Sequence, residues 1–181
     1  MDLKGSITIA ADRMTVWAAL NDAEILRASI PGCTAMTGDA QSGFTATVTQ
    51  KIGPVKATFK GTVIISDVVE GYSYQIAGHG KAGPAGYAHG SASVTLEDAG
   101  GATRLSYEVT AKVGGKIAAL GARLIDGIAR QLADKFFENL QNAVETEDEA
   151  DQDAEKLAQP GLLTQPGILG KIWKWLKGLI R

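Results

Sequence analysis

The sequence is poor in the residues that build most metal and redox sites. Among 181 residues it has one cysteine, Cys33, and two histidines, His79 and His89. One cysteine cannot form an internal disulfide, and a lone cysteine usually packs as a small buried apolar side chain. Both histidines are expected on outward-facing strand positions, with no Asp, Glu or Cys cluster at ligand spacing nearby. This distribution argues against a metal centre.

Motifs of catalysis and nucleotide binding are also missing. The sequence contains no nucleophile–base motif, no P-loop and no dinucleotide-binding fingerprint. Its glycines fall at turns between strands rather than in a strand–loop–helix context. We therefore expect a binding or carrier protein rather than an enzyme.

Long apolar runs and a strong net charge are absent as well. No stretch approaches the roughly 20 apolar residues that span a bilayer, and the N-terminal residues do not have the pattern of a signal peptide. The formal net charge is −2, which gives no overall attraction to nucleic acid. The expected location is the cytoplasm, with at most a peripheral attachment to the inner face of the cell membrane.

Alternating apolar and polar residues dominate the first two thirds of the chain, and this period is typical of half-buried strands. An N-cap at Asp12 and a Pro31-Gly32 stop bracket two short helices after the first strand. The strands are joined by short turns, which favours an antiparallel meander. The predicted strands cover residues 3–10, 44–52, 55–65, 72–78, 88–96 and 105–113.

The period changes to that of a helix from about residue 116 to 144. Apolar residues at helical spacing form a stripe wide enough to cover the dry face of the sheet. The predicted fold is therefore α+β, a helix-grip fold in which a curved antiparallel sheet wraps around a long C-terminal helix.

Many positions on the inward face of the predicted sheet are small. They are Ala46, Ala57, Gly61, Gly78, Gly80, Ala88, Gly90, Ala92 and Ala111. Because protein interiors pack densely, such a face either approaches the helix closely or leaves a void. We predict an internal hydrophobic cavity that binds a ligand. The alternative is that these residues mark strong sheet curvature and tight packing.

The predicted ligand-binding residues come from this face and from the helix stripe. Gln50 is the polar exception: its amide could bond a ligand carbonyl, or bond backbone or water instead. Tyr74 and Tyr107 could offer hydroxyl groups or simply pack. The full set is Phe44, Ala46, Val48, Gln50, Ala57, Phe59, Gly61, Val63, Tyr74, Ile76, Ala92, Val94, Tyr107, Val109, Leu120, Gly121, Leu124, Ile128 and Leu132.

An acidic segment separates this domain, residues 1–145, from the end of the chain. Residues 145–155 carry seven acidic side chains and no basic one, and two Pro-Gly pairs follow. Like charges in a block repel one another and remain solvated. We predict a flexible linker over residues 146–167.

Residues 168–181, ILGKIWKWLKGLIR, form a basic amphipathic pattern. Tryptophans opposite a basic face are typical of helices that lie in an anionic membrane interface. A helix that docks in a partner protein, or one that folds back on its own domain, is the alternative. The predicted membrane-binding residues are Ile168, Leu169, Lys171, Ile172, Trp173, Lys174, Trp175, Leu176, Lys177, Leu179, Ile180 and Arg181.

Several stretches resemble the CoxG family of carbon monoxide dehydrogenase proteins, within the START-like, SRPBCC superfamily. They are IPGC at 30–33, IGPVKATFKGTV at 52–63, the glycine-rich segment at 78–96, and VGGKIAALGARLIDGIARQLADKFFENL at 113–140. The resemblance implies a helix-grip fold with an internal cavity. It also implies a role beside aerobic carbon monoxide dehydrogenase, a molybdenum hydroxylase whose electrons enter a membrane quinone pool.

Three functions follow from these observations. The first is a carrier that binds a respiratory quinone, menaquinone or ubiquinone, in its cavity and links the dehydrogenase to the membrane. The second is a recruitment module with a packed interior. The third is a cyclase- or hydrolase-type enzyme of the START-like kind, for which the inward face offers few polar groups.

Overall fold

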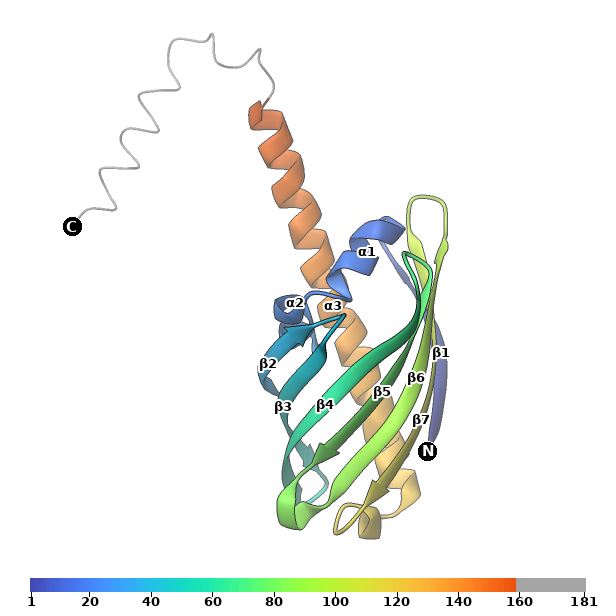
Figure 1. The fold of residues 1–181 in the computed structure, drawn as a ribbon, viewed down its shortest axis with the longest axis vertical. Coiled ribbons are helices and arrows are strands. Elements are labelled where there is room, and N and C mark those ends of the chain that lie inside the picture. Colours follow the sequence, from blue (N-terminus) through green and yellow to red (C-terminus); the bar gives the residue numbers. More distant parts are fainter. Residues whose placement is uncertain (159–181) are drawn as a thin grey trace, which may run out of the picture. The chain divides into compact units, whose positions relative to one another are not determined.

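The computed structural model describes residues 1–158, and side-chain surroundings as far as Glu145 (Figure 1). The predicted membrane helix, residues 168–181, lies outside the described residues. The elements are β1 (Asp2–Ile9), α1 (Arg13–Ala19), α2 (Ala23–Ser29), β2 (Cys33–Asp39), β3 (Gly43–Ile52), β4 (Val55–Val69), β5 (Ser73–Lys81), η1 (Gly83–Ala85), β6 (Tyr87–Asp98), β7 (Thr103–Gly114), η2 (Ala118–Leu120) and α3 (Ala122–Ala158).

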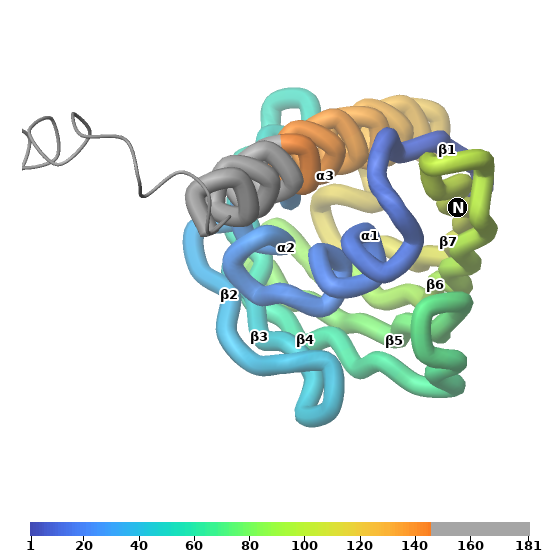
Figure 2. The backbone as a smooth tube through the Cα atoms, turned by 90° about the horizontal axis from the view of Figure 1, so that it is seen from above, coloured from blue at the N-terminus to red at the C-terminus, as the bar shows by residue number. Residues whose placement is uncertain are grey.

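The seven strands form one antiparallel sheet in the order β1-β7-β6-β5-β4-β3-β2. Only the β1–β7 pairing joins strands distant in sequence, so the rest is the predicted meander. Seen from above, the sheet curls beneath α3 while α1 and α2 lie across one end (Figure 2). The α+β helix-grip fold is confirmed.

Local signals fix the two short helices. The carboxylate of Asp12 accepts hydrogen bonds from the N–H groups of Met14 and Thr15, and Asp22 caps α2 in the same way. These bonds satisfy N–H groups that have no partner inside a helix. Asp12 is therefore the N-cap that the sequence predicts.

The main core lies at the end of the domain that α1 and α2 cover. Its largest fully buried side chains include Ile9, Val16, Leu105, Leu140 and Val144. Side chains from β1, α1, β7 and α3 therefore meet here. This core closes one end of the space between sheet and helix.

Several predicted boundaries differ from the structure. Strand β2 was not predicted, because its exposed polar residues hide the alternation. The long helix begins at Ala122 rather than near residue 116, since Gly121 has a φ of +90° that ends the short η2 turn. It continues to Ala158, so residues 146–158 of the predicted linker are helical. The remainder of that linker lies beyond the part of the chain that the structure describes.

Cys33 also differs from its prediction. It is half-buried at the start of β2, and its thiol donates to the carbonyl of Ala35 at 3.4 Å. Its position on a strand at the edge of the sheet explains the partial exposure.

Candidate ligand-binding cavity

A cavity of about 470 Å³ lies between the sheet and α3. Its walls come from strands β3 to β7 and from the first half of α3, and most are aliphatic or glycine. The lining residues include Ala46, Val48, Gln50, Ile52, Phe59, Gly61, Val63, Ile76, Gly78, Gly80, Ala88, Gly90, Ala92, Val109, Ala111, Val113, Ile117, Ile125, Ile128, Ala129 and Leu132. The small residues of the inward face thus border an actual hollow.

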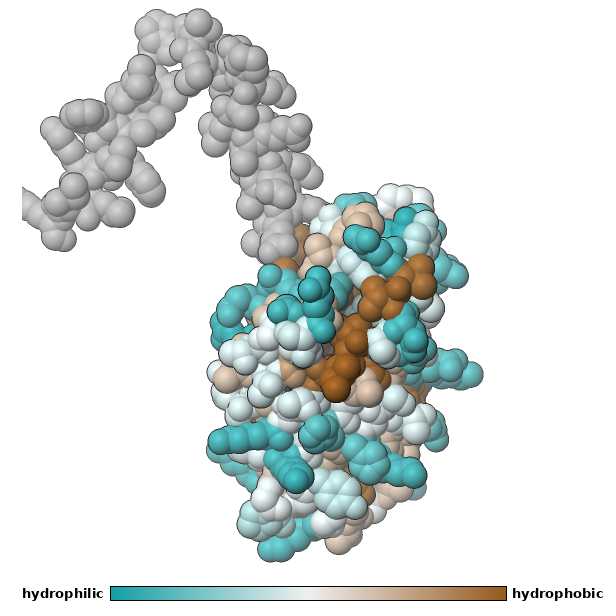
Figure 3. Space-filling model, in the orientation of Figure 1, coloured by the Kyte–Doolittle hydropathy of each residue, from teal (hydrophilic) through white to brown (hydrophobic). Residues whose placement is uncertain are grey.

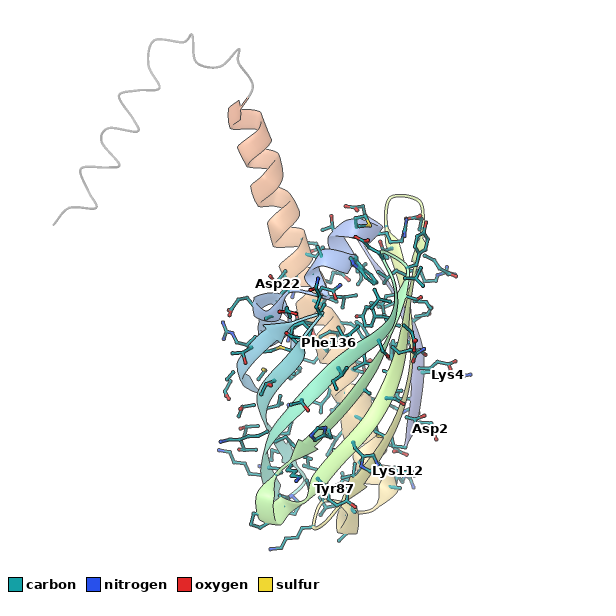
Figure 4. All side chains as sticks on the ribbon, in the orientation of Figure 1. Asp2, Lys4, Asp22, Tyr87, Lys112 and Phe136 are labelled. Carbon is teal, nitrogen blue, oxygen red and sulfur yellow. The ribbon has the colours of Figure 1, made fainter. Side chains whose placement is uncertain are left out.

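A second hollow of about 230 Å³ lies nearer to α1 and α2. It shares Val63 and Ile76 with the larger cavity, so the two adjoin along β4 and β5. Phe136 of α3 lines it from the helix side and lies between the helix and the sheet (Figure 4). Together the two hollows provide an elongated apolar space.

The predicted ligand-binding residues divide into three groups. Those at the larger cavity are Ala46, Val48, Gln50, Phe59, Gly61, Val63, Ile76, Ala92, Val109, Ile128 and Leu132. Those at the smaller hollow are Phe44, Tyr74, Val94 and Tyr107. Those that line neither hollow are Ala57, Leu120, Gly121 and Leu124.

The four misplaced residues have clear physical reasons. Ala57 is buried in a small cluster with Ile52, Ala82 and Ile117 that closes the end of the sheet. Leu120 and Gly121 lie in the η2 turn and its cap instead of on the long helix. Leu124 has a 41% exposed side chain, because the later start of α3 changes which residues face the sheet.

Two of the cavity glycines owe their identity to backbone contact. A Cβ atom on Gly61 would lie 2.3 Å from the carbonyl oxygen of His79, and one on Gly90 would lie 2.4 Å from that of Thr110. Close strand approach and sheet curvature therefore explain these two positions. At Gly80 a Cβ would meet only ordinary contacts with Phe59, at 3.6 Å, so the missing side chain there adds open space.

Some lining residues were not among the predicted ligand-binding set. The signal for Ile117 and Ile125 was present in the apolar stripe, but Met1 had none, because a chain terminus has no periodic pattern. Its amino group donates to the carbonyl of Ala111 at 3.0 Å, which extends the β1–β7 pairing by one residue. Met1 is thereby held at the cavity wall.

Polar groups are scarce in both hollows. The side-chain amide of Gln50 donates to the backbone carbonyl of Pro31, so the backbone-bonded alternative is the one observed. Burial raises the pKa of Tyr74. Burial, with nearby Asp134, raises the pKa of Tyr107. The ring of Tyr107 stacks on Phe137 at 5.0 Å. Both tyrosines are neutral at physiological pH, so the space favours an uncharged apolar ligand.

A further hollow of about 490 Å³ lies between the end of β7 and the start of α3. It shares Met1, Ala111, Val113 and Ile125 with the main cavity. Strand β1 begins at Asp2, opposite Thr110, so the β7 edge beyond Ala111 is not paired with it. The main cavity therefore has an approach along this side of the domain.

The histidines lie on the outer face, as predicted. His79 and His89 are exposed cross-strand partners, and the hydroxyl of Thr62 lies 3.3 Å from Nδ1 of His79. Within the described residues, no group of three or more His, Cys, Asp or Glu side chains is placed to hold a metal ion. Over the same part of the chain, no helix is both long and apolar enough to cross a membrane.

Comparison with known proteins agrees with the architecture. The family model for the carbon monoxide dehydrogenase protein CoxG matches residues 5–145. No curated protein matches the chain. A conserved protein from Geobacillus kaustophilus is 28% identical, with a TM-score of 0.75 over 81% of this chain and 96% of that one.

More distant solved structures share the fold alone. Protein Ms6760 from Mycobacterium smegmatis is 18% identical, with a TM-score of 0.62 over 81% of this chain and 92% of its own. The protein Ara h 8.0201 is 14% identical, with a TM-score of 0.58 over 81% and 98%. The helix-grip arrangement is thus retained at low sequence identity.

Proposed function

Because the chain belongs to the CoxG family of carbon monoxide dehydrogenase proteins, an accessory rather than catalytic family, we propose that it carries a respiratory quinone for the dehydrogenase. The quinone, menaquinone or ubiquinone, occupies the cavity between the sheet and α3. The protein works on the inner face of the cell membrane and links the dehydrogenase to the quinone pool.

The apolar cavity is the observation that carries this proposal. A prenylated quinone has a flat ring with two carbonyl oxygens and a long hydrocarbon tail. An aliphatic space about 470 Å³ in volume, continued by the smaller hollow towards Phe136, offers the surface that such a ligand needs. Burying the tail removes apolar area from water at about 25 cal/mol per Å².

The ring of the quinone needs few polar partners. The amide of Gln50 has a second N–H group beside the one that bonds Pro31, and a quinone carbonyl can accept it. The hydroxyl of Tyr107, with its raised pKa, remains protonated and can donate in the smaller hollow. Either contact would orient the ring without charging the cavity.

Residues 168–181 supply the membrane contact in this proposal. Their basic and tryptophan-rich pattern favours an anionic lipid interface. Each basic residue near such a surface contributes about 1 kcal/mol. A carrier with its own membrane helix could collect a lipid-soluble ligand and present it to a soluble enzyme.

Reconstitution tests this function. The dehydrogenase, carbon monoxide and quinone-containing vesicles are combined with and without the full chain, and quinol formation is followed by absorbance. We expect quinol to form faster in the presence of the chain. Equal rates with and without it would contradict a carrier role. A gain that persists when the cavity is filled would favour the recruitment module instead.

A further inference from the structure

Three connections meet at one end of the domain, opposite α1 and α2 (Figure 1). They join β3 to β4, β5 to β6, and β7 to α3. The N–H of Ile117 donates to the carbonyl of Ala85 at 3.1 Å, and Ile52, Ala82 and Ile117 share one buried cluster. The three connections and their flanking residues form a single surface, which we call the basic end.

The basic end has a marked excess of positive charge. Its charged side chains are Lys51, Lys56, Lys81, Lys112, Lys116 and Arg123, all exposed. No Asp or Glu occurs in residues 40–66, 71–96 or 109–125, which supply these connections. Asp126, half-buried on the first turns of α3, is the first acidic residue after them.

The opposite end of the domain has the reverse bias. Its turns and helix starts carry Asp12, Asp22, Glu24, Asp39, Asp67, Glu70, Glu97 and Asp98. Arg13 and Arg27 there are paired with Asp98 and Glu24. The domain is therefore polarised along its length although its net charge is small. Such separation orients a molecule in the field of a charged surface.

Apolar side chains project among the positive charges. Leu124 is 41% exposed, and a Cβ on Gly53 would lie 3.3 Å from its Cδ2 atom, so it sits beside the β3–β4 turn. Tyr87 is 50% exposed and stacks on His89, with ring centres 6.0 Å apart. Tyr87 and Lys112 project from the lower part of the sheet (Figure 4).

We propose that the basic end is itself a docking surface for anionic lipid headgroups, with Leu124 and Tyr87 entering the interface between them. This inference rests on the proposed function in one respect. The ligand dissolves in the membrane, and the cavity reaches this end of the domain through Ile52, Val113 and Ile117. Docking by this end places the cavity against the lipid phase.

Lipid explains the surface better than an acidic protein. Basic residues around exposed leucine and tyrosine side chains are the pattern of interfacial membrane binding. The tips of the connections are short and built from Gly53-Pro54 and Gly83-Pro84, which leaves few side chains for a specific protein contact. Hydrophilic side chains also extend over the lower outer face (Figure 3).

Fluorescent labels on the full chain test the orientation. In a Cys33→Ser background, Leu124→Cys marks the basic end and Val68→Cys, at a 53% exposed site, marks the other end. Each is labelled with an environment-sensitive dye and mixed with vesicles of phosphatidylcholine and phosphatidylglycerol. We expect a blue shift at Leu124→Cys and none at Val68→Cys. Equal shifts, or a shift at Val68→Cys alone, would overturn the proposal.

Charge variants provide the second readout. Lys51, Lys56, Lys81 and Lys116 are changed together to Gln. The matched control changes Lys4, Arg27, Arg104 and Lys135, exposed residues away from the basic end, to Gln as well. Circular dichroism confirms that both variants fold.

We expect the first variant to bind the anionic vesicles at least about tenfold more weakly and the control to lose much less. Equal losses would show that only net charge matters and would contradict a defined surface. Unchanged vesicle binding with lost binding to the dehydrogenase would assign the basic end to an acidic protein instead. Neither readout requires a quinone, so an empty cavity would refute the carrier function without affecting this test.

Discussion

Ala92 on β6 and Ala129 on α3 line the same cavity from opposite sides, one from the sheet and one from the helix. A larger side chain at either position would occupy ligand space without disturbing a buried backbone contact. The same is not true of Gly61, where any Cβ meets the backbone of β5. The alanines therefore separate loss of the cavity from loss of the fold.

Ala92→Phe and Ala129→Phe should each lower the amount of bound quinone severalfold, because the new ring fills part of the cavity. The melting temperature should change by only a few degrees, since the ring enters existing space. Quinone content is measured by extraction and chromatography. Ala77→Phe, on an exposed neighbouring position of β5, is the matched control and should load normally.

Gln50→Leu should lower the free energy of unfolding by about 1–3 kcal/mol. It removes the donor to the Pro31 carbonyl and leaves that group without its side-chain partner. Chemical denaturation measures the change. Gln75→Leu, at an exposed position on β5, should cost much less. Equal effects of the two substitutions would mean that the bond to Pro31 contributes little.

Asp12→Ala should destabilise the protein by about 1 kcal/mol at neutral pH, because α1 loses its N-cap. Hydrogen bonds from the Thr15 side chain and backbone lower the pKa of Asp12. The ionised form is thus favoured in the folded state, and its contribution is lost as the pH falls below about 4. The stability difference between wild type and variant should shrink over that range in denaturation curves.

Asp12→Asn is the control for this effect. It keeps a capping oxygen but removes the charge, so most of the stability at neutral pH should remain while the dependence on Asp12 ionisation disappears. A difference between wild type and Asp12→Ala that stays constant down to strongly acidic pH would contradict the role of the carboxylate.

Removal of residues 159–181 should reduce co-sedimentation with anionic vesicles by at least about tenfold. The cut follows Ala158 because Val144 is fully buried in the main core, so a chain ending there would expose the domain. Trp173→Glu with Trp175→Glu in the full chain is the companion variant. Unchanged sedimentation of both proteins would refute a membrane role for the C-terminal segment.

The alternation of apolar and polar residues predicted the sheet, the long helix and the side on which small residues gather. It did not predict β2, whose exposed residues leave little apolar signal. It also placed Leu120 and Leu124 on the cavity, because periodicity alone does not reveal that Gly121 ends one turn before α3 begins. Ala57 was misplaced for a related reason: alternation assigns a face, but not the point along the strand where a buried cluster replaces the hollow.

Charge polarity was also hidden from the sequence analysis. The lysines of the basic end are spread over residues 51–116 and interleaved with neutral stretches, and the net charge of −2 conceals them. Only the meeting of three connections, held by the bond from Ile117 to Ala85, brings them onto one surface.

Mass spectrometry of an organic extract tests the carrier function most directly. The full chain and the Ala92→Phe, Ala129→Phe double variant are purified identically from cells that produce quinones. The account predicts a prenylated quinone close to one per protein in the wild type and little in the double variant. A wild-type protein that carries no quinone, even after incubation with quinone-containing vesicles, would contradict it.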